Sequence, residues 1–124
     1  MCMDDQLKEF VNTIYKDLGP GYNECVYHKA MEVMLRAQGV QYESERIVPI
    51  VFHGHTIGNL RSDIIVEGEI VLEFKSVRTL TDAAALQTRN YLRLTGLSLG
   101  YLINFGHRGL EVVKIEASLE TPSP

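Results

Sequence analysis

The first apolar positions of the chain recur at intervals of three and four residues, which is the spacing of one helix face. Asp4 or Asp5 can cap this helix, and the Gly-Pro-Gly run at 19–21 ends it. A second helix is predicted to start directly after that turn and to end at Gln38, ahead of Gly39. The inward faces are assigned to Leu7, Phe10, Val11, Ile14, Tyr15 and Leu18 in the first helix and to Val26, Tyr27, Ala30, Val33, Met34 and Ala37 in the second.

Two apolar runs with a turn signal between them predict a β-hairpin in the middle of the chain. Residues 64–66 form the first run, Glu67-Gly68 is the turn, and residues 70–74 form the second run. Upstream, residues 40–52 have a β-like composition, and HGHTIG at 53–58 is predicted as a turn. Three strands are therefore expected between the second helix and the next one.

A third helix and two further strands complete the predicted order. Thr81 or Asp82 caps a helix that reaches Thr95, and strands follow at about 99–105 and 110–115. The connection from the hairpin through this helix is long enough for a right-handed parallel crossover, which would place the helix over the Glu73 and Lys75 end of the sheet. The pattern predicts an α/β fold with a mixed central β-sheet flanked by α-helices.

Three ionisable residues stand at one end of the predicted hairpin. Asp63 opens its first strand, and Glu73 and Lys75 close its second, two residues apart and thus on the same face, with Phe74 on the other. Two carboxylates form a hard-oxygen site for a divalent ion such as Mg²⁺, and a lysine beside them can assist a water or stabilise transition-state charge. A surface ion pair at a strand end is the simpler alternative.

Composition and charge restrict the function classes. The chain has 124 residues, and 12 basic against 16 acidic residues give a net charge of −4, so no global basic field attracts nucleic acid. We expect one domain over residues 1–119 and a flexible tail at 120–124. Cys2 and Cys25 are the only cysteines, which excludes a thiolate zinc site. No membrane span or signal peptide is recognised, so an intracellular protein, cytoplasmic or nuclear and not secreted, is expected.

Four segments in order resemble one known family. GYNECVY at 21–27 is similar to the Gly-x-x-Glu-x-x-Tyr signature of the GxxExxY protein family, and SDIIVEGEIVLEFKS, LQTRNYLRLTG and LGYLINFG match it further along. The resemblance implies a PD-(D/E)XK nuclease with a restriction-endonuclease-like core, close to the RecB-like branch. Ser62 stands where the superfamily's proline is found. By that resemblance Asp63, Glu73 and Glu24 hold the metal, Lys75 and Gln87 join them in catalysis, and Tyr91 and Tyr27 contact substrate.

Several residues admit an ordinary explanation beside the functional one. Glu24 is a half-buried carboxylate of the site or a solvated residue of a first helical turn, where a negative charge is favourable. Gln87 is a ligand of Lys75 or a plain surface residue, and Tyr91 is as readily a core residue. Arg61 and Arg89 are candidates for a phosphate-binding patch. His53 and His55 are explained best by a solvent-exposed turn.

The predicted function is a Mg²⁺- or Mn²⁺-dependent nuclease that hydrolyses phosphodiester bonds of DNA or RNA. The alternative is a catalytically silent nuclease-fold module that binds nucleic acid or a protein partner. Pairing of two copies into a homodimer along a free sheet edge stays open at this stage.

Overall fold

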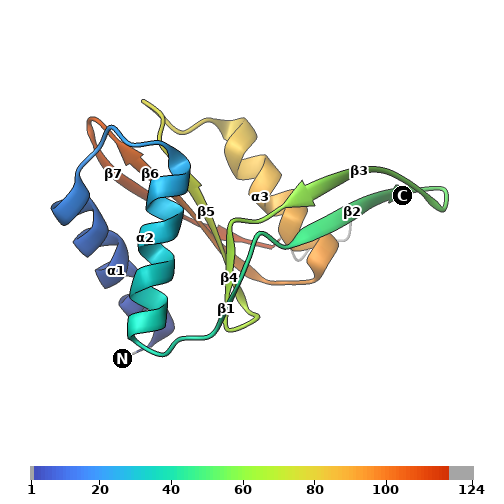
Figure 1. Ribbon diagram of the computed structural model, residues 1–124. Coiled ribbons are helices and arrows are strands. Elements are labelled where there is room, and N and C mark those ends of the chain that lie inside the picture. The colour runs from blue at the N-terminus through green and yellow to red at the C-terminus, as the bar shows by residue number, and fades with distance from the viewer. Residues whose placement is uncertain (1, 118–124) are drawn as a thin grey trace.

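Two helical layers enclose a central β-sheet in the computed structural model, which describes residues 2–117. Helices α1 and α2 cover one face of the sheet and α3 covers the other (Figure 1). The predicted tail at 120–124 lies outside the described residues. No helix among the described residues is long and apolar enough to cross a membrane.

The first two helices end where predicted, but α1 starts earlier than predicted, with Cys2 at its N-cap and Asp4 and Asp5 inside its first turn. The predicted inward faces also differ from the real ones. Helix α1 spans Met3–Leu18 and buries four of its six assigned positions, whereas Leu18 is exposed. Helix α2 spans Glu24–Ala37, and the face predicted for it is rotated from the real one. Val33 and Ala37 are exposed, which corrects the prediction. The residues buried by α2 are Tyr27, His28, Met31 and Leu35.

The central sheet is mixed, which confirms the predicted fold class. Its five strands have the order β1-β4-β5-β6-β7, from Tyr42–Ser44, Ile64–Val66, Ile70–Lys75, Leu99–Gly106 and Gly109–Glu116. Strand β6 runs parallel to β5, and the other neighbours are antiparallel. The predicted hairpin therefore exists as β4 and β5, and the crossover to β6 is parallel as expected.

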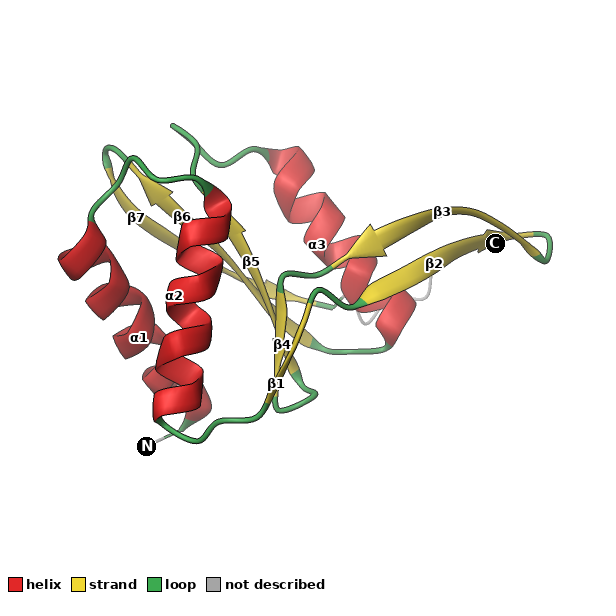
Figure 2. Ribbon diagram, in the orientation of Figure 1, coloured by secondary structure: helices red, strands yellow, loops and turns green. Residues whose placement is uncertain are grey.

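Two strands outside this sheet form a separate hairpin that extends away from the body (Figure 2). Strand β2 spans Ile47–Phe52 and β3 spans His55–Arg61, so the predicted turn at 53–58 is wrong: only His53 and Gly54 connect the strands. Both have positive φ, 48° and 79°, as a two-residue type I′ turn requires. We call residues 47–61 the arm. The described chain thus has seven strands instead of the predicted five.

Helix α3 spans Asp82–Thr95 and begins as predicted, since the Thr81 hydroxyl accepts a hydrogen bond from the Ala84 N–H at 3.2 Å. It packs on β6, β7 and β2, and it covers the sheet face that Val71 shares with Glu73 and Lys75. Tyr91 and Leu92 of α3 lie in an apolar cluster with Val71, and the half-buried side chains of Val48 and Leu60 pack against it. The root of the arm is therefore fixed to the body through α3.

Candidate active site

The β4–β5 ladder brings Asp63 and Glu73 to the same end of the sheet. Ile64 pairs with Leu72, so the position before the first is opposite the position after the second. Asp63 is held there by a hydrogen bond of 2.7 Å that its Oδ2 accepts from the Phe74 N–H. Phe74 itself is buried in the core under α1 and α2, so Glu73 and Lys75 point to the opposite face of the sheet.

Glu73 is a half-buried carboxyl with an unusual affinity for its proton. Removal from water and, next, the negative charge of Asp63 raise the pKa of Glu73 from 4.5 to about 8, although the Lys75 ammonium acts in the opposite direction. The protein thus holds two carboxyl groups close enough to repel each other and supplies only part of the positive charge that would stabilise them as a pair.

Asn104 fixes the chain directly after Lys75. In the parallel register Lys75 lies beside Asn104 of β6, which is fully buried. Its Oδ1 accepts from the Val77 N–H at 2.9 Å, and its Nδ2 donates to the Val77 carbonyl and to Glu111 Oε1, each at 2.9 Å. The side chain therefore serves as a clamp on the loop that leaves the site, and no pattern in the sequence identified it.

His28 is the second residue that sequence reasoning missed. It is only 9% exposed, and its Nδ1 lies 3.9 Å from Asp63 Oδ1. Its Nε2 lies 2.7 Å from Ser44 Oγ and 3.5 Å from Glu32 Oε1. The ring thus connects α2 to the first carboxylate of the site. The available signal was the i, i+4 spacing of His28 and Glu32 on one helix face.

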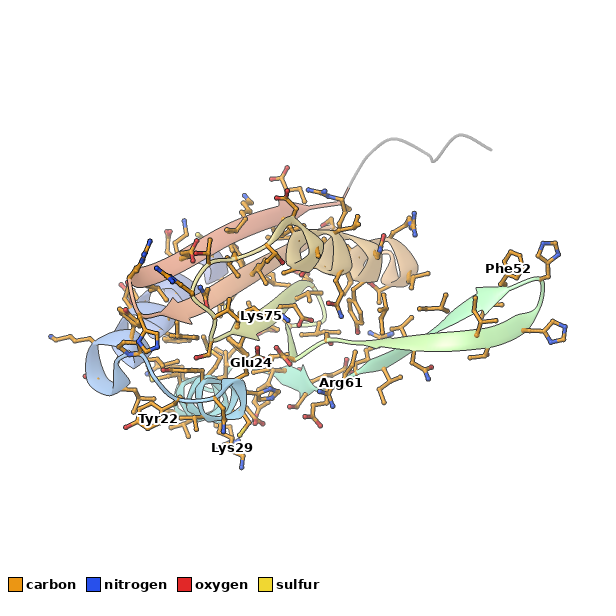
Figure 3. All side chains as sticks on the ribbon, turned by 90° about the horizontal axis from the view of Figure 1, so that it is seen from above. Tyr22, Glu24, Lys29, Phe52, Arg61 and Lys75 are labelled. Carbon is orange, nitrogen blue, oxygen red and sulfur yellow. The ribbon has the colours of Figure 1, made fainter. Side chains whose placement is uncertain are left out.

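Glu24 is exposed, which corrects the prediction of a half-buried carboxylate. It lines an open groove with Tyr22, Ser76 and His107, and the Ser76 hydroxyl donates to the Tyr22 carbonyl at 2.6 Å, which ties the start of α2 to the end of β5. Glu24 and Lys75 accordingly lie near each other in Figure 3. Glu24 nevertheless does not complete a three-ligand cluster: the described residues contain no group of three His, Cys, Asp or Glu arranged to hold a metal.

The two tyrosines predicted to contact substrate lie in the core instead. Tyr27 has no exposed surface and stacks on Phe105 with ring centroids 4.1 Å apart, while its hydroxyl donates to the Gly19 carbonyl at 2.7 Å. Tyr91 is 2% exposed, and its hydroxyl donates to the Arg46 carbonyl at 3.2 Å. Burial raises the pKa of Tyr91, which keeps this donor protonated. Both side chains support the walls of the site and offer no face to a substrate.

The remaining predicted residues, Gln87, Arg89 and Arg61, are exposed. Gln87 and Arg89 lie on α3. Arg61 ends β3, two residues before Asp63, and its guanidinium lies 4.0 Å from Glu45 Oε1. Of this group only Arg61 is next to the carboxylates along the chain.

The donor set fits a hard divalent cation. Asp63 and Glu73 offer carboxylate oxygens, and burial and, next, the charge of Asp63 raise the pKa of Glu73, so a bound cation would favour its ionised form. A cation that binds through one or two carboxylates and keeps several waters requires no third protein ligand, which agrees with a site of only two. When bound, such an ion would polarise a phosphodiester and lower the pKa of a water.

Comparison with known proteins places the chain in a family. The model of the PD-(D/E)XK nuclease superfamily matches residues 3–115. No curated protein matches the sequence. Among solved structures, the fold is similar to the crystal structure of SSO0001, with a TM-score of 0.59 and 22% identity over 77% of this chain and 50% of that one. It is also similar to an alkaline exonuclease (LHK-Exo) from Laribacter hongkongensis, with a TM-score of 0.57 and 12% identity over 77% and 57%.

The chain spans about half the length of these two structures, which at such identities show the fold alone. The match to the superfamily model, in contrast, extends over nearly all described residues, including the segments that hold Asp63, Glu73 and Lys75. The chain belongs to the PD-(D/E)XK nuclease superfamily.

Proposed function

We propose that this protein is a Mg²⁺- or Mn²⁺-dependent nuclease that hydrolyses phosphodiester bonds of DNA or RNA, and that it belongs to the GxxExxY group near the RecB-like branch of its superfamily. The observation that carries the proposal is the position of two carboxyls and a lysine at one end of the sheet. Asp63 is fixed by the Phe74 N–H, Glu73 is half-buried beside it, and Lys75 follows on the same strand.

Each residue has a distinct role in this proposal. Asp63 and Glu73 would hold the cation, which requires Glu73 to release its proton. Lys75 would orient the attacking water or stabilise negative charge that develops on the phosphate. Glu24, exposed in the groove at the start of α2, would orient water or substrate and not act as a third metal ligand. His28 would keep Asp63 in place from the side of α2.

Cleavage assays with variants of the site residues test the proposal. Labelled single-stranded and duplex DNA and RNA are incubated with Mg²⁺ or Mn²⁺ and with wild type, Asp63→Asn or Lys75→Ala. Glu69→Gln is the matched control, because it removes an exposed carboxylate from the turn of the same hairpin. We expect metal-dependent cleavage by wild type and Glu69→Gln and at least a hundredfold loss in the other two.

Metal titration separates this proposal from the binding-module alternative. Calorimetry with Mn²⁺ should give binding to wild type and much weaker binding to Asp63→Asn. If wild type neither binds the metal nor cleaves any substrate, the nuclease proposal is wrong, and a silent nuclease-fold module that binds nucleic acid or protein replaces it.

A further inference from the structure

The arm is the largest feature of the molecule that the proposed chemistry does not use. It is a two-stranded hairpin in which Ile47 is opposite Arg61 at the root and Phe52 is opposite His55 at the tip, and a register shift between Ile50 and Val51 leaves Ile57 without a partner on β2. Ile47, Phe52 and Ile57 are 61%, 60% and 64% exposed. Exposed apolar side chains are therefore distributed along the arm, with a cation at its root and an imidazole at its tip.

Contacts at its root explain why the arm has a fixed direction. Val48 and Leu60 pack against the α3 cluster, and the Tyr91 hydroxyl donates to the Arg46 carbonyl at the root. An isolated two-stranded hairpin is marginal in water, so this anchoring is what keeps the arm extended. Only the root is anchored, and the end of the arm with Phe52 extends beyond the rest of the body in Figure 3.

The charge of the arm suits a polyanion. Residues 46–62 contain two arginines and two histidines and no aspartate or glutamate, although the chain as a whole has 16 acidic residues and a net charge of −4. The two arginines face Glu45 at 4.0 Å and Glu43 at 3.7 Å in ion pairs that are about half exposed. Such pairs contribute little in water, so a phosphate can replace the carboxylates as partner.

The arm is also continuous with the proposed site. Strand β3 ends at Arg61, and the chain reaches Asp63 two residues later, where the Glu45 N–H donates to the Asp63 carbonyl at 2.9 Å. Seven residues of β3 at about 3.3 Å each place the tip roughly 20 Å from Arg61. That length corresponds to about six nucleotides at 3.4 Å per nucleotide.

Because the arm exposes large apolar side chains, it is suited to bases more than to phosphates. Phe and Ile side chains contact nucleic acid by stacking on bases or by insertion between them, whereas the faces of bases inside an intact duplex are covered by their neighbours. We propose that the arm binds exposed bases of the substrate, at a single strand or a duplex end. Phe52 and His53, whose ring centroids are 4.4 Å apart, lie at its tip and stack on these bases. This proposal deepens the proposed nuclease function and rests on it for the identity of the ligand.

Binding measured without cleavage tests the arm separately from the chemistry. The Asp63→Asn protein, with and without Phe52→Ala, is titrated with three fluorescent DNAs. These are a single strand, a duplex with a single-stranded overhang, and a dumbbell duplex whose two ends are closed by short loops. We expect Phe52→Ala to weaken binding to the first two about tenfold, as for the loss of one base–aromatic stack, and to change dumbbell binding less than twofold. Ile57→Ala, which removes another exposed apolar side chain of the arm, should act in the same direction.

Val33→Ala is the matched control, since Val33 is 55% exposed on α2, away from the arm, and its loss should change no affinity. Circular dichroism checks that each variant is folded. An equal loss on all three DNAs, or none, overturns the proposal, as does sedimentation that shows Phe52→Ala converting a dimer into a monomer, because the arm would then be an interface between copies.

The outcomes for arm and chemistry are distinguishable. Phe52-dependent binding in a protein whose wild type cleaves nothing would leave the arm proposal standing and refute only the nuclease. Normal metal-dependent cleavage with no effect of Phe52→Ala on binding would refute only the arm.

Discussion

Replacement of Glu73 by glutamine should make the metal-free protein more stable at alkaline pH. The native state holds the Glu73 proton more tightly than the unfolded chain, because burial and Asp63 raise the pKa from 4.5 to about 8. Between these two values the native state binds more protons than the unfolded state, so the free energy of unfolding falls as pH rises. The stability is fully present below pH 4.5 and is lost as the pH approaches and passes 8. Glutamine has the same shape and no charge, so it removes this loss.

The size of the effect follows from the shift. At 1.36 kcal/mol per pKa unit, a rise from 4.5 to about 8 corresponds to an upper limit of about 4 kcal/mol at pH 8. Glu73 is half-buried, so screening by solvent and relaxation around the ionised carboxylate reduce this limit. Between pH 5 and pH 8.5, the free energy of unfolding of Glu73→Gln should rise by about 1–3 kcal/mol relative to that of wild type. Lys75 lowers the pKa of Glu73, so in Lys75→Ala the loss of stability should extend to higher pH and be larger in total than in wild type.

Urea unfolding with EDTA at pH 5, 7 and 8.5 measures this difference. Glu69→Gln, the exposed carboxylate of the same hairpin, should show a constant difference from wild type across the three values. Added Mg²⁺ at pH 8.5 should stabilise wild type and leave Glu73→Gln nearly unchanged, since a ligand stabilises only the state that binds it. A difference between Glu73→Gln and wild type that is the same at pH 5 and pH 8.5 would refute the reasoning.

Three further substitutions test how the site is supported. His28→Ala should lower kcat about tenfold with KM and fold retained, because the ring positions Asp63 and does not contact substrate; an unchanged kcat would remove His28 from the site. Asn104→Ala should lower the free energy of unfolding by about 2–4 kcal/mol in urea titration, since the clamp on Val77 is lost and polar groups are left unpaired; a loss below 0.5 kcal/mol would contradict the clamp. Tyr27→Phe should lower the free energy of unfolding by about 1 kcal/mol and leave the Mn²⁺ affinity within twofold of wild type. A large loss of Mn²⁺ affinity would assign the hydroxyl to the metal site.

The parts of the fold encoded by short sequence patterns were predictable. The β4–β5 hairpin follows from two apolar runs and the Glu67-Gly68 turn, and the Thr81 cap with Gly96 limits α3. The pairing of Asp63 with Glu73 then follows from hairpin register alone. These features depend on neighbours in sequence or on a single turn, which a pattern can specify.

The arm was not predictable, because its strands do not alternate regularly. A bulge between Ile50 and Val51 shifts the register and leaves Ile57 without a partner on β2. Only α3, which is remote in sequence, makes Leu60 an inward position. The period-2 signal that identifies a half-buried strand is therefore absent from β3.

The supporting residues of the site were missed for a related reason. His28 occupies an inward position of α2 because Ser44 and Glu32 satisfy its ring, so the real face is rotated from the one that apolar residues alone indicate. Asn104 lies in an apolar strand and is explained only by the loop that crosses it at Val77. Such polar partners come from distant segments, and no local pattern specifies them.

The three residues of the Gly-x-x-Glu-x-x-Tyr signature have different roles in the structure. Gly21 has a φ of 108°, and the Tyr27 hydroxyl donates to the Gly19 carbonyl and accepts from the Tyr22 N–H at 3.3 Å, so both residues close the bend between α1 and α2. Glu24 lines the groove beside Gly21 and is the only one of the three signature residues that offers it an ionisable side chain. A homologue that had lost Asp63 and Glu73 could therefore keep the first and last letters of the motif under selection for folding alone. The presence of this motif alone would therefore not identify an active enzyme, and the β4–β5 carboxylates have to be checked as well.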